Sequence, residues 1–82
     1  MRYRLEIKEE ARKQLRGLSK KERQNIGQRL DLLQDDLAGD VRKLTARTQE
    51  YRLRVGGLRV LFMLENDLIS VYRVKDRKEA YE

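Results

Sequence analysis

Three arginines, Arg52, Arg54 and Arg59, have the spacing that brings guanidinium groups together on a β-hairpin. They alternate with apolar residues on either side of Gly56-Gly57, and a two-glycine link between alternating segments is typical of a hairpin turn. With the glycines as the loop, Arg54 stands opposite Arg59, and Arg52 lies one step away. Like charges directly opposite one another destabilise a sheet. The arrangement therefore predicts an anionic ligand, and a phosphate group fits it best.

Guanidinium groups placed in this way suit phosphodiester chemistry. Each planar fork can pair with two phosphate oxygens at once. During cleavage, negative charge gathers on the phosphate oxygens of the transition state, where fixed cations stabilise it. RNA supplies its own nucleophile in the 2′-hydroxyl, so the protein needs no serine or cysteine nucleophile. On an open sheet face, Tyr72 or Tyr81 could also stack on an unpaired base.

The same residues also have structural interpretations. Charged residues that alternate outward on a strand usually form only a solvated surface, and the convergence of three arginines is what favours a functional one. Tyr51 and Phe62 are expected in the core. Arg73 follows the strand register onto the expected core side, where a structural ion pair and a catalytic role fit equally well.

The positive charge of the chain is concentrated in one segment. The 82 residues carry a formal net charge of +6, with a sequence pI of about 9.9. Between positions 42 and 59, Glu50 is the one acid. The basic residues of that segment are Arg42, Lys43, Arg47, Arg52, Arg54 and Arg59. Such a local excess indicates an anionic partner for this part of the chain.

The composition also excludes several classes of protein. Without cysteine or histidine, the chain has neither disulfides nor thiolate or imidazole ligands, and it lacks the usual general base near neutral pH. We therefore expect a protein without metal or cofactor. No stretch approaches the roughly 20 apolar residues of a membrane span, and the first residues lack an apolar signal segment. A cytoplasmic protein without membrane contact is expected.

The N-terminal half predicts a strand followed by two helices. Residues 3–7 alternate like a half-buried strand. A helix should begin at Glu9 and close at Gly17. The segment Ser19-Lys20-Lys21-Glu22 fits a capping box, which starts a second helix that should reach about Leu37. Because the link is short, we expect an antiparallel helical hairpin.

The C-terminal half predicts strands. Residues 41–49 are expected to form a basic loop anchored by Leu44, followed by the hairpin of residues 51–64 and a last strand over 68–74. The order β-α-α-β-β-β predicts one α+β domain over residues 1–82. Its helical hairpin should pack on one face of a small, mostly antiparallel sheet, with the arginines on the open face. The pairing of the first strand stays open.

Taken together, these segments resemble the RelE/ParE superfamily of toxins from type II toxin–antitoxin modules. The resemblance extends over nearly the whole chain. It is strongest in the hairpin, Tyr51-Arg52-Leu53-Arg54-Val55-Gly56-Gly57-Leu58-Arg59-Val60, and in the closing segment, Val71-Tyr72-Arg73-Val74-Lys75-Asp76-Arg77-Lys78-Glu79-Ala80-Tyr81. Both motifs are similar to those of RelE-like members.

The resemblance implies a ribosome-dependent mRNA endonuclease that enters the ribosomal A site and leaves a 2′,3′-cyclic phosphate. The catalytic positions of such toxins match Arg52, Arg54, Arg59, Arg77 and Tyr81. Lys75 takes the place of Arg77 if no gap is allowed. We expect further contacts with RNA from Lys43, Arg47, Lys75 and Lys78.

The general base stays undecided at this point. Arginine is a poor base, because its pKa stays above about 12. Asp76 lies where some relatives place a histidine. Tyr81, Lys75 or a carboxylate such as Glu50 could take the proton, or catalysis could rest on positioning and charge with help from the ribosome.

Two other functions compete with the nuclease. A ParE-like inhibitor of DNA gyrase would use the same fold without cutting RNA. A nontoxic RNA-binding module would bind with steep salt dependence and cut nothing. Either toxin function implies a cognate antitoxin whose acidic, extended segment wraps the protein and covers the basic face. The free toxin is expected to be a monomer that forms a hetero-oligomer with its antitoxin.

Overall fold

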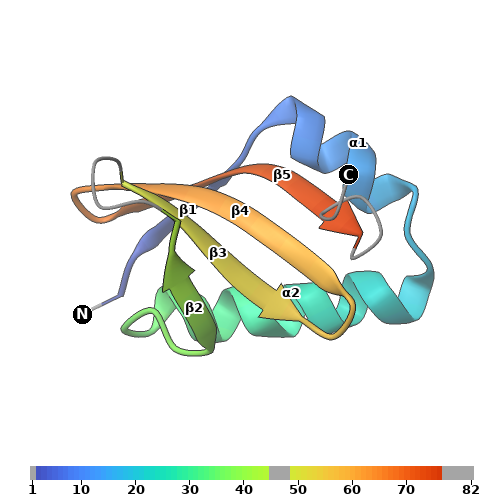
Figure 1. Cartoon of the computed structure of the whole chain (residues 1–82), viewed down its shortest axis with the longest axis horizontal. Helices are drawn as coiled ribbons and strands as arrows, with labels where there is room; N and C mark the ends of the chain where they lie inside the picture. The colour runs from blue at the N-terminus through green and yellow to red at the C-terminus, as the bar shows by residue number, and fades with distance from the viewer. Residues whose placement is uncertain (1, 45–48, 77–82) are drawn as a thin grey trace.

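The computed structural model describes residues 2–44 and 49–76, which form two helices and a five-stranded sheet (Figure 1). In chain order the elements are β1 (Arg4–Ile7), α1 (Glu9–Arg16), α2 (Lys20–Gln34), β2 (Asp40–Lys43), β3 (Glu50–Val55), β4 (Leu58–Glu65) and β5 (Leu68–Asp76). The sheet order is β1-β5-β4-β3-β2. Only the β1–β5 pair is parallel among these strands. The predicted α+β class with a mostly antiparallel sheet is confirmed.

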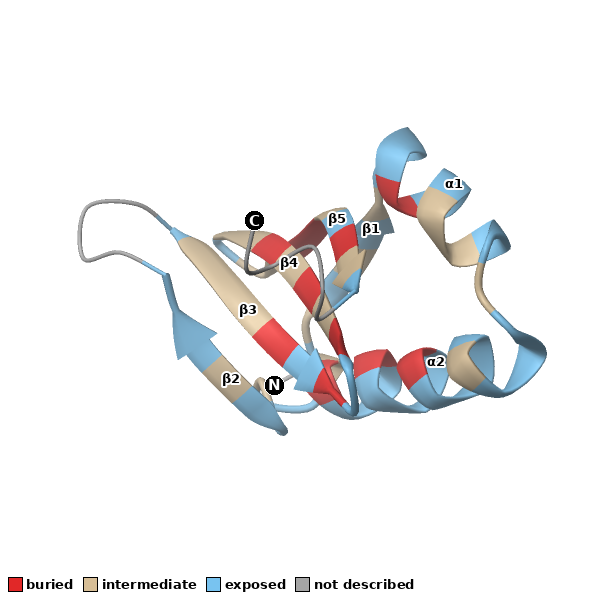
Figure 2. Ribbon diagram, turned by 45° about the vertical axis from the view of Figure 1, so that its right-hand side comes forward, coloured by how far each residue is buried: buried red, intermediate tan, exposed pale blue. Residues whose placement is uncertain are grey.

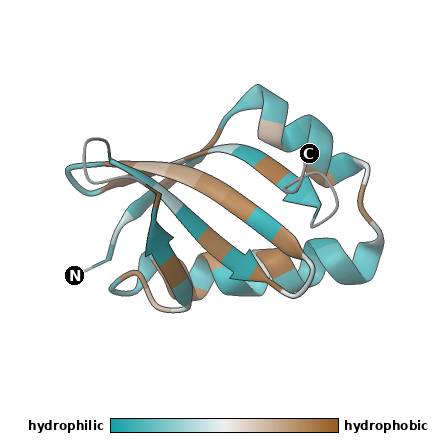
Figure 3. Ribbon diagram, in the orientation of Figure 1, coloured by the Kyte–Doolittle hydropathy of each residue, from teal (hydrophilic) through white to brown (hydrophobic). Residues whose placement is uncertain are grey.

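The β3–β4 hairpin has the register predicted from its alternating residues. Arg54 pairs with Arg59, and Gly56 begins the turn with a φ of +59°. Such a positive φ is easily adopted by glycine, which has no Cβ. Along β3 the ribbon alternates between hydrophilic and hydrophobic residues (Figure 3). Leu53 is fully buried while Arg54 is exposed, so the two faces of the hairpin differ as expected.

Both helices begin and end for local reasons. The Ser19 side chain accepts from the Glu22 amide, and the Glu22 carboxylate accepts from the Ser19 amide, which confirms the capping box. Gly17 follows α1 as its C-cap. The second helix ends earlier than predicted, at Gln34, because the chain leaves helical geometry at Asp35. Leu37, the expected end, has a φ of +57°.

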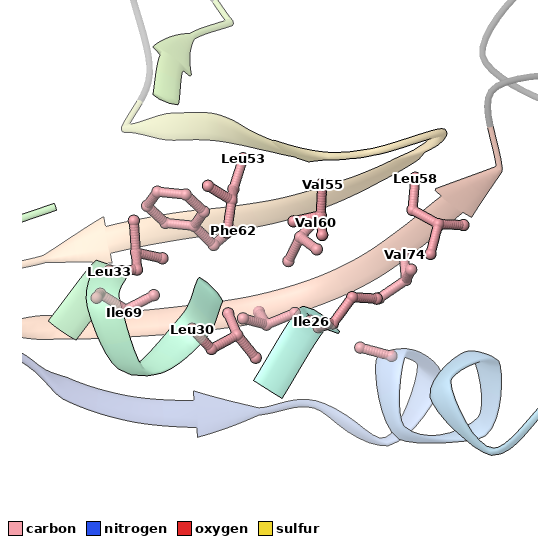
Figure 4. Close-up of a cluster of buried hydrophobic side chains, with 12 residues drawn as sticks. Ile26, Leu30, Leu33, Leu53, Val55, Leu58, Val60, Phe62, Ile69 and Val74 are labelled. Carbon is pink, nitrogen blue, oxygen red and sulfur yellow. The ribbon is translucent and has the colours of Figure 1, made fainter. Parts of the chain in front are cut away.

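A single hydrophobic core lies between the helices and one sheet face. The helices run in opposite senses along this face, with α1 against β5 and α2 against β3 (Figure 1). Figure 4 shows Leu33 of α2 directed toward Leu53 and Phe62 of the hairpin. Phe62 is fully buried, and its ring stacks on that of Tyr51 with centroids 5.5 Å apart. The predicted core placement of both aromatics is therefore confirmed. Figure 2 shows buried residues on both helices and on β3, β4 and β5.

One strand was missed in the sequence. Residues 40–43, expected to begin a basic loop, form the edge strand β2, which pairs antiparallel with β3 from Asp40–Arg54 to Lys43–Tyr51. The strand is short and mostly charged, so its existence depends on the neighbouring strand rather than on its own alternation. Leu44 does not anchor this segment in the core, because 47% of it is exposed.

A β-bulge in β5 overturns the expected position of Arg73. Phe62 pairs with Val71, but Leu61 pairs with Arg73, so Tyr72 is an extra residue in the strand. From this point the alternation is inverted. Val74 is buried opposite Val60, whereas Arg73 is exposed. Arg73 therefore lies on the open face of the sheet and not on the core side.

The first strand is held at the other edge of the sheet. It runs parallel to β5, and Arg4 makes a forked contact with Asp67 in the β4–β5 turn, with its shortest N–O distance at 2.9 Å. The hydrogen bond from Arg4 lowers the pKa of the Asp67 carboxyl below its usual range. Within residues 2–44 and 49–76, neither helix has the length and apolar character needed to cross a membrane.

Candidate functional site

Cations from four strands form two rows across the sheet face that lies opposite the helices, which we call the cationic face. The register places residues of neighbouring strands side by side. The first row, nearest the hairpin turn, contains Asp40, Arg54, Arg59 and Lys75. The second row contains Arg42, Arg52, Leu61 and Arg73. Of the catalytic residues predicted from the sequence, the structure thus brings together Arg52, Arg54 and Arg59.

A shallow cavity of about 220 Å³ lies between the two rows. Its lining consists of Leu44, Arg52, Arg59, Leu61 and Lys75. Three cations therefore surround an apolar floor. A phosphate could accept hydrogen bonds from the cations while an adjoining sugar or base contacts the leucines. The exposed Leu44, expected to anchor a loop, instead contributes to this cavity.

Four cations of the cationic face have no ion-pair partner among the described residues. Arg52, Arg54, Arg73 and Lys75 form no ion pair with any residue that the structure describes. The ion pairs observed in that part of the chain involve cations of the N-terminal segment: Arg2, Arg4, Lys8 and Arg16. Among the same residues, no group of acidic side chains is placed to hold a metal ion. These four cations of the sheet are thus available to bind an anion.

Arg52 differs from the other arginines of this face in the burial of its Nε atom. Its Nε atom is buried and has no hydrogen-bond partner in the described part of the chain. A buried donor without a partner costs about 1–3 kcal/mol in stability. The buried Nε of Arg52 therefore lowers the stability of the fold, which is common for side chains that bind a ligand.

We expect Arg52→Met to leave the free energy of unfolding unchanged or to raise it by about 1 kcal/mol. The substitution removes the unsatisfied donor, while the unbranched Met side chain replaces the aliphatic stem of Arg52. Urea unfolding followed by circular dichroism measures the difference. A loss above about 1 kcal/mol would show that Arg52 supports the fold in a way that its contacts do not reveal.

The other predicted site residues do not all lie on the cationic face. Lys43 lies on the opposite, helical side of the sheet, with its Nζ 5.9 Å from the centroid of the Tyr51 ring. Its predicted contact with RNA is therefore not supported by a position beside the arginines. Lys75 does line the cavity. The remaining four predictions, Arg47, Arg77, Lys78 and Tyr81, lie outside the described residues.

Sequence reasoning did not place two residues of the cationic face. Arg42 reaches it through β2, and the bulge brings Arg73 to it. Tyr72, which the sequence offered as a residue that could stack on a base, also reaches this face, where its hydroxyl donates to Oε1 of Glu50 over 3.5 Å. One signal could have revealed the bulge: the buried positions Val71 and Val74 are three residues apart, where a regular strand requires an even spacing.

The comparisons with known proteins agree with this fold. Residues 5–81 match the family model described as the ParE toxin of the type II toxin–antitoxin system parDE. No curated protein matches the chain. Among solved structures, a RelB–RelE antitoxin–toxin complex from Methanococcus jannaschii aligns with a TM-score of 0.79 and 25% identity, over 93% of this chain and 94% of that chain.

A second similar structure is the archaeal RelE–RelB complex from Pyrococcus horikoshii OT3. It aligns with a TM-score of 0.78 and 28% identity, over 94% of this chain and 97% of that chain. The family match and both structural matches cover nearly the whole chain, and the resemblance noted in the hairpin and closing segments agrees with them. The chain belongs to the ParE toxin family of type II toxin–antitoxin systems, within the RelE/ParE superfamily.

Proposed function

We propose that this toxin is a ribosome-dependent endoribonuclease that cleaves mRNA in the ribosomal A site and so stops translation. The observation that carries the proposal is the cavity between Arg52, Arg59 and Lys75, whose floor is apolar. The similarity to RelE chains of two antitoxin–toxin complexes supports the same function. Such a toxin would act in the cytoplasm, where ribosomes translate.

In the proposed reaction the 2′-hydroxyl oxygen of the mRNA attacks the adjacent phosphorus. The bond from phosphorus to the 5′-oxygen breaks, which leaves a 2′,3′-cyclic phosphate and a new 5′-hydroxyl. The proton of the 2′-hydroxyl passes to a base, and the 5′-oxygen gains a proton. Arg52, Arg59 and Lys75, which line the cavity, stabilise the charge on the phosphate oxygens of the transition state, and Arg54 is paired with Arg59 on the neighbouring strand. No metal is required for these steps.

Lys75, Glu50 and Tyr81 stay candidates for the general base, and Tyr72 does not join them. Burial, and then the nearby Glu50, raise the pKa of Tyr72 above its ordinary value, so its phenol stays neutral and is unsuited to accept a proton. Lys75 lines the cavity directly. Glu50 lies beside Tyr72 on the cationic face. Tyr81, the remaining candidate, lies outside the described residues.

A cognate antitoxin follows from the same proposal. Both similar structures contain a toxin bound to its antitoxin. We expect an acidic segment of the partner to cover the cationic face, because Arg52, Arg54, Arg73 and Lys75 have no ion-pair partner among the described residues. The toxin would then be inactive in the complex and monomeric when released.

Gyrase inhibition is the second candidate, and the name of the matched family favours it. One pair of assays separates the two functions. The released toxin is added to mRNA with and without translating ribosomes, and, in parallel, to DNA gyrase in a supercoiling reaction. We expect cleavage that requires ribosomes, 2′,3′-cyclic phosphate ends, and normal supercoiling. Inhibited supercoiling together with intact mRNA would show that the toxin inhibits gyrase and is not a nuclease.

A further inference from the structure

The β-bulge in β5 places an aromatic side chain beside the cation rows. Tyr72 is the extra residue, between Val71 paired with Phe62 and Arg73 paired with Leu61. Its hydroxyl reaches the carboxylate of Glu50, which alternates with Tyr51 and therefore lies on the cationic face. Tyr72 thus belongs to the same face as the arginines.

The distance between the β3 and β5 backbones determines where the Tyr72 ring lies. Glu50 is on β3 and Tyr72 on β5, with β4 between them. Neighbouring strands lie about 4.8 Å apart, so the two backbones are separated by roughly 10 Å. The side chains can meet only by leaning toward one another across β4, where Met63 pairs with Glu50. The ring therefore extends along the sheet, and it remains partly exposed.

Polar groups at this position are arranged to hold the pair together. Burial and the Glu50 carboxylate raise the pKa of the Tyr72 phenol. The phenol therefore stays protonated and donates a hydrogen bond to Glu50. A carboxylate has about four lone-pair sites. Glu50 can therefore accept from Tyr72 and still accept from a bound ligand.

The pair lies next to the proposed cleavage cavity. Glu50 precedes Arg52, a residue of the cavity lining, by two positions in the same strand. Two residues of a strand span about 7 Å. This separation is comparable with the size of one nucleotide in an extended single strand. A chain whose phosphate occupies the cavity would therefore bring a neighbouring base to Tyr72.

We propose that Tyr72 and Glu50 form a base-binding subsite, in which the phenol ring stacks on an unpaired base and the carboxylate accepts a hydrogen bond from the amino group of that base. The subsite rests on the proposed endoribonuclease function and gives it a sequence preference. Stacking on an aromatic ring tolerates every base, whereas hydrogen bonds select among them. Adenine, cytosine and guanine carry an exocyclic amino group, whereas the N3–H donor of uracil lies between two carbonyl oxygens that repel a carboxylate. The subsite therefore disfavours uracil at one position beside the cut by about tenfold.

The experiment maps cleavage sites by sequencing the ends of ribosome-bound mRNA after treatment with wild-type toxin and with variants. Glu50→Gln replaces one acceptor oxygen with an amide donor that uracil can use. Tyr72→Leu removes the stacking ring, and Tyr72→Phe keeps it. Tyr51→Phe, on the helical side of the sheet, and Glu65→Gln, at the exposed end of β4, serve as matched controls.

We expect Glu50→Gln to raise the share of uracil at a single position near the cut by several-fold. Tyr72→Leu should flatten the preference at that position, Tyr72→Phe should restore it, and the two controls should keep the wild-type pattern. With an active wild-type toxin, either an unchanged pattern or a complete loss of cleavage in Glu50→Gln would overturn the subsite but not the nuclease, because a loss of cleavage would assign Glu50 to proton transfer instead of base recognition. If the wild-type toxin cuts no mRNA, both the proposed nuclease function and the proposed subsite are wrong.

Discussion

Replacing Arg59 with alanine is expected to slow mRNA cleavage by about 10²–10³-fold. Arg59 has the central position in the first cation row, between Arg54 on β3 and Lys75 on β5. It also lines the cavity in which the phosphate is proposed to bind. Removing one fixed donor from a transition state that gathers negative charge typically has an effect of this size. Single-turnover cleavage with saturating toxin measures the chemical step directly.

The fold should tolerate this change. Arg59 lies on the sheet face opposite the helices and is only partly buried, so the free energy of unfolding should change by less than about 1 kcal/mol. Arg16→Ala is a matched control, because Arg16 is an exposed residue of α1 that pairs only with Glu9 among the described carboxylates. Equal cleavage rates for Arg59→Ala and Arg16→Ala would show that Arg59 is not part of the proposed site.

Phe62→Ala is expected to lower the free energy of unfolding by about 3–5 kcal/mol. The side chain is fully buried at the centre of β4, stacks on Tyr51 and faces Leu33 of α2 (Figure 4). A domain of this size has a total stability of roughly 5–15 kcal/mol. No disulfide can compensate, because the chain contains no cysteine. Much of the Phe62→Ala protein should therefore be unfolded at 37 °C.

The adjacent position on β4 provides the comparison. Met63 is only partly buried and lies on the cationic face, so Met63→Ala should cost well under half as much as Phe62→Ala. Chemical denaturation of both variants gives the two free energies under identical conditions. Similar losses at the two positions would contradict a core that lies on one side of the sheet.

Local patterns were sufficient for much of the fold and for the centre of the site. The register that places Arg54 opposite Arg59 follows from regular alternation and a two-glycine turn, both of which lie within fifteen residues of the chain. The capping box of α2 is similarly local, since Ser19 and Glu22 satisfy each other's backbone groups. In each case the interacting residues are close in sequence, so their spacing specifies the geometry.

The features that were missed depend on distant contacts. The strand β2 has little alternation of its own and forms because β3 offers a free edge. The parallel pairing of β1 with β5 joins residues more than sixty positions apart, which no local pattern reports. The position of Arg73 depended on a break in periodicity near Tyr72, and regular alternation was assumed to continue. Each of these features depends on how the strands pair with one another.

The bulge at Tyr72 makes the length of β5 as important as its composition. Deleting this residue would restore an uninterrupted two-residue period, and the side chains of positions 73–76 would exchange sides. Val74 would turn toward water and two cations would turn beneath α1. Substitutions in this strand alter one contact at a time, whereas a change in residue number alters all that follow. In an alignment of related toxins, a one-residue gap at this position therefore separates chains that carry their charges on different faces of the sheet. This holds even where the aligned residues are identical.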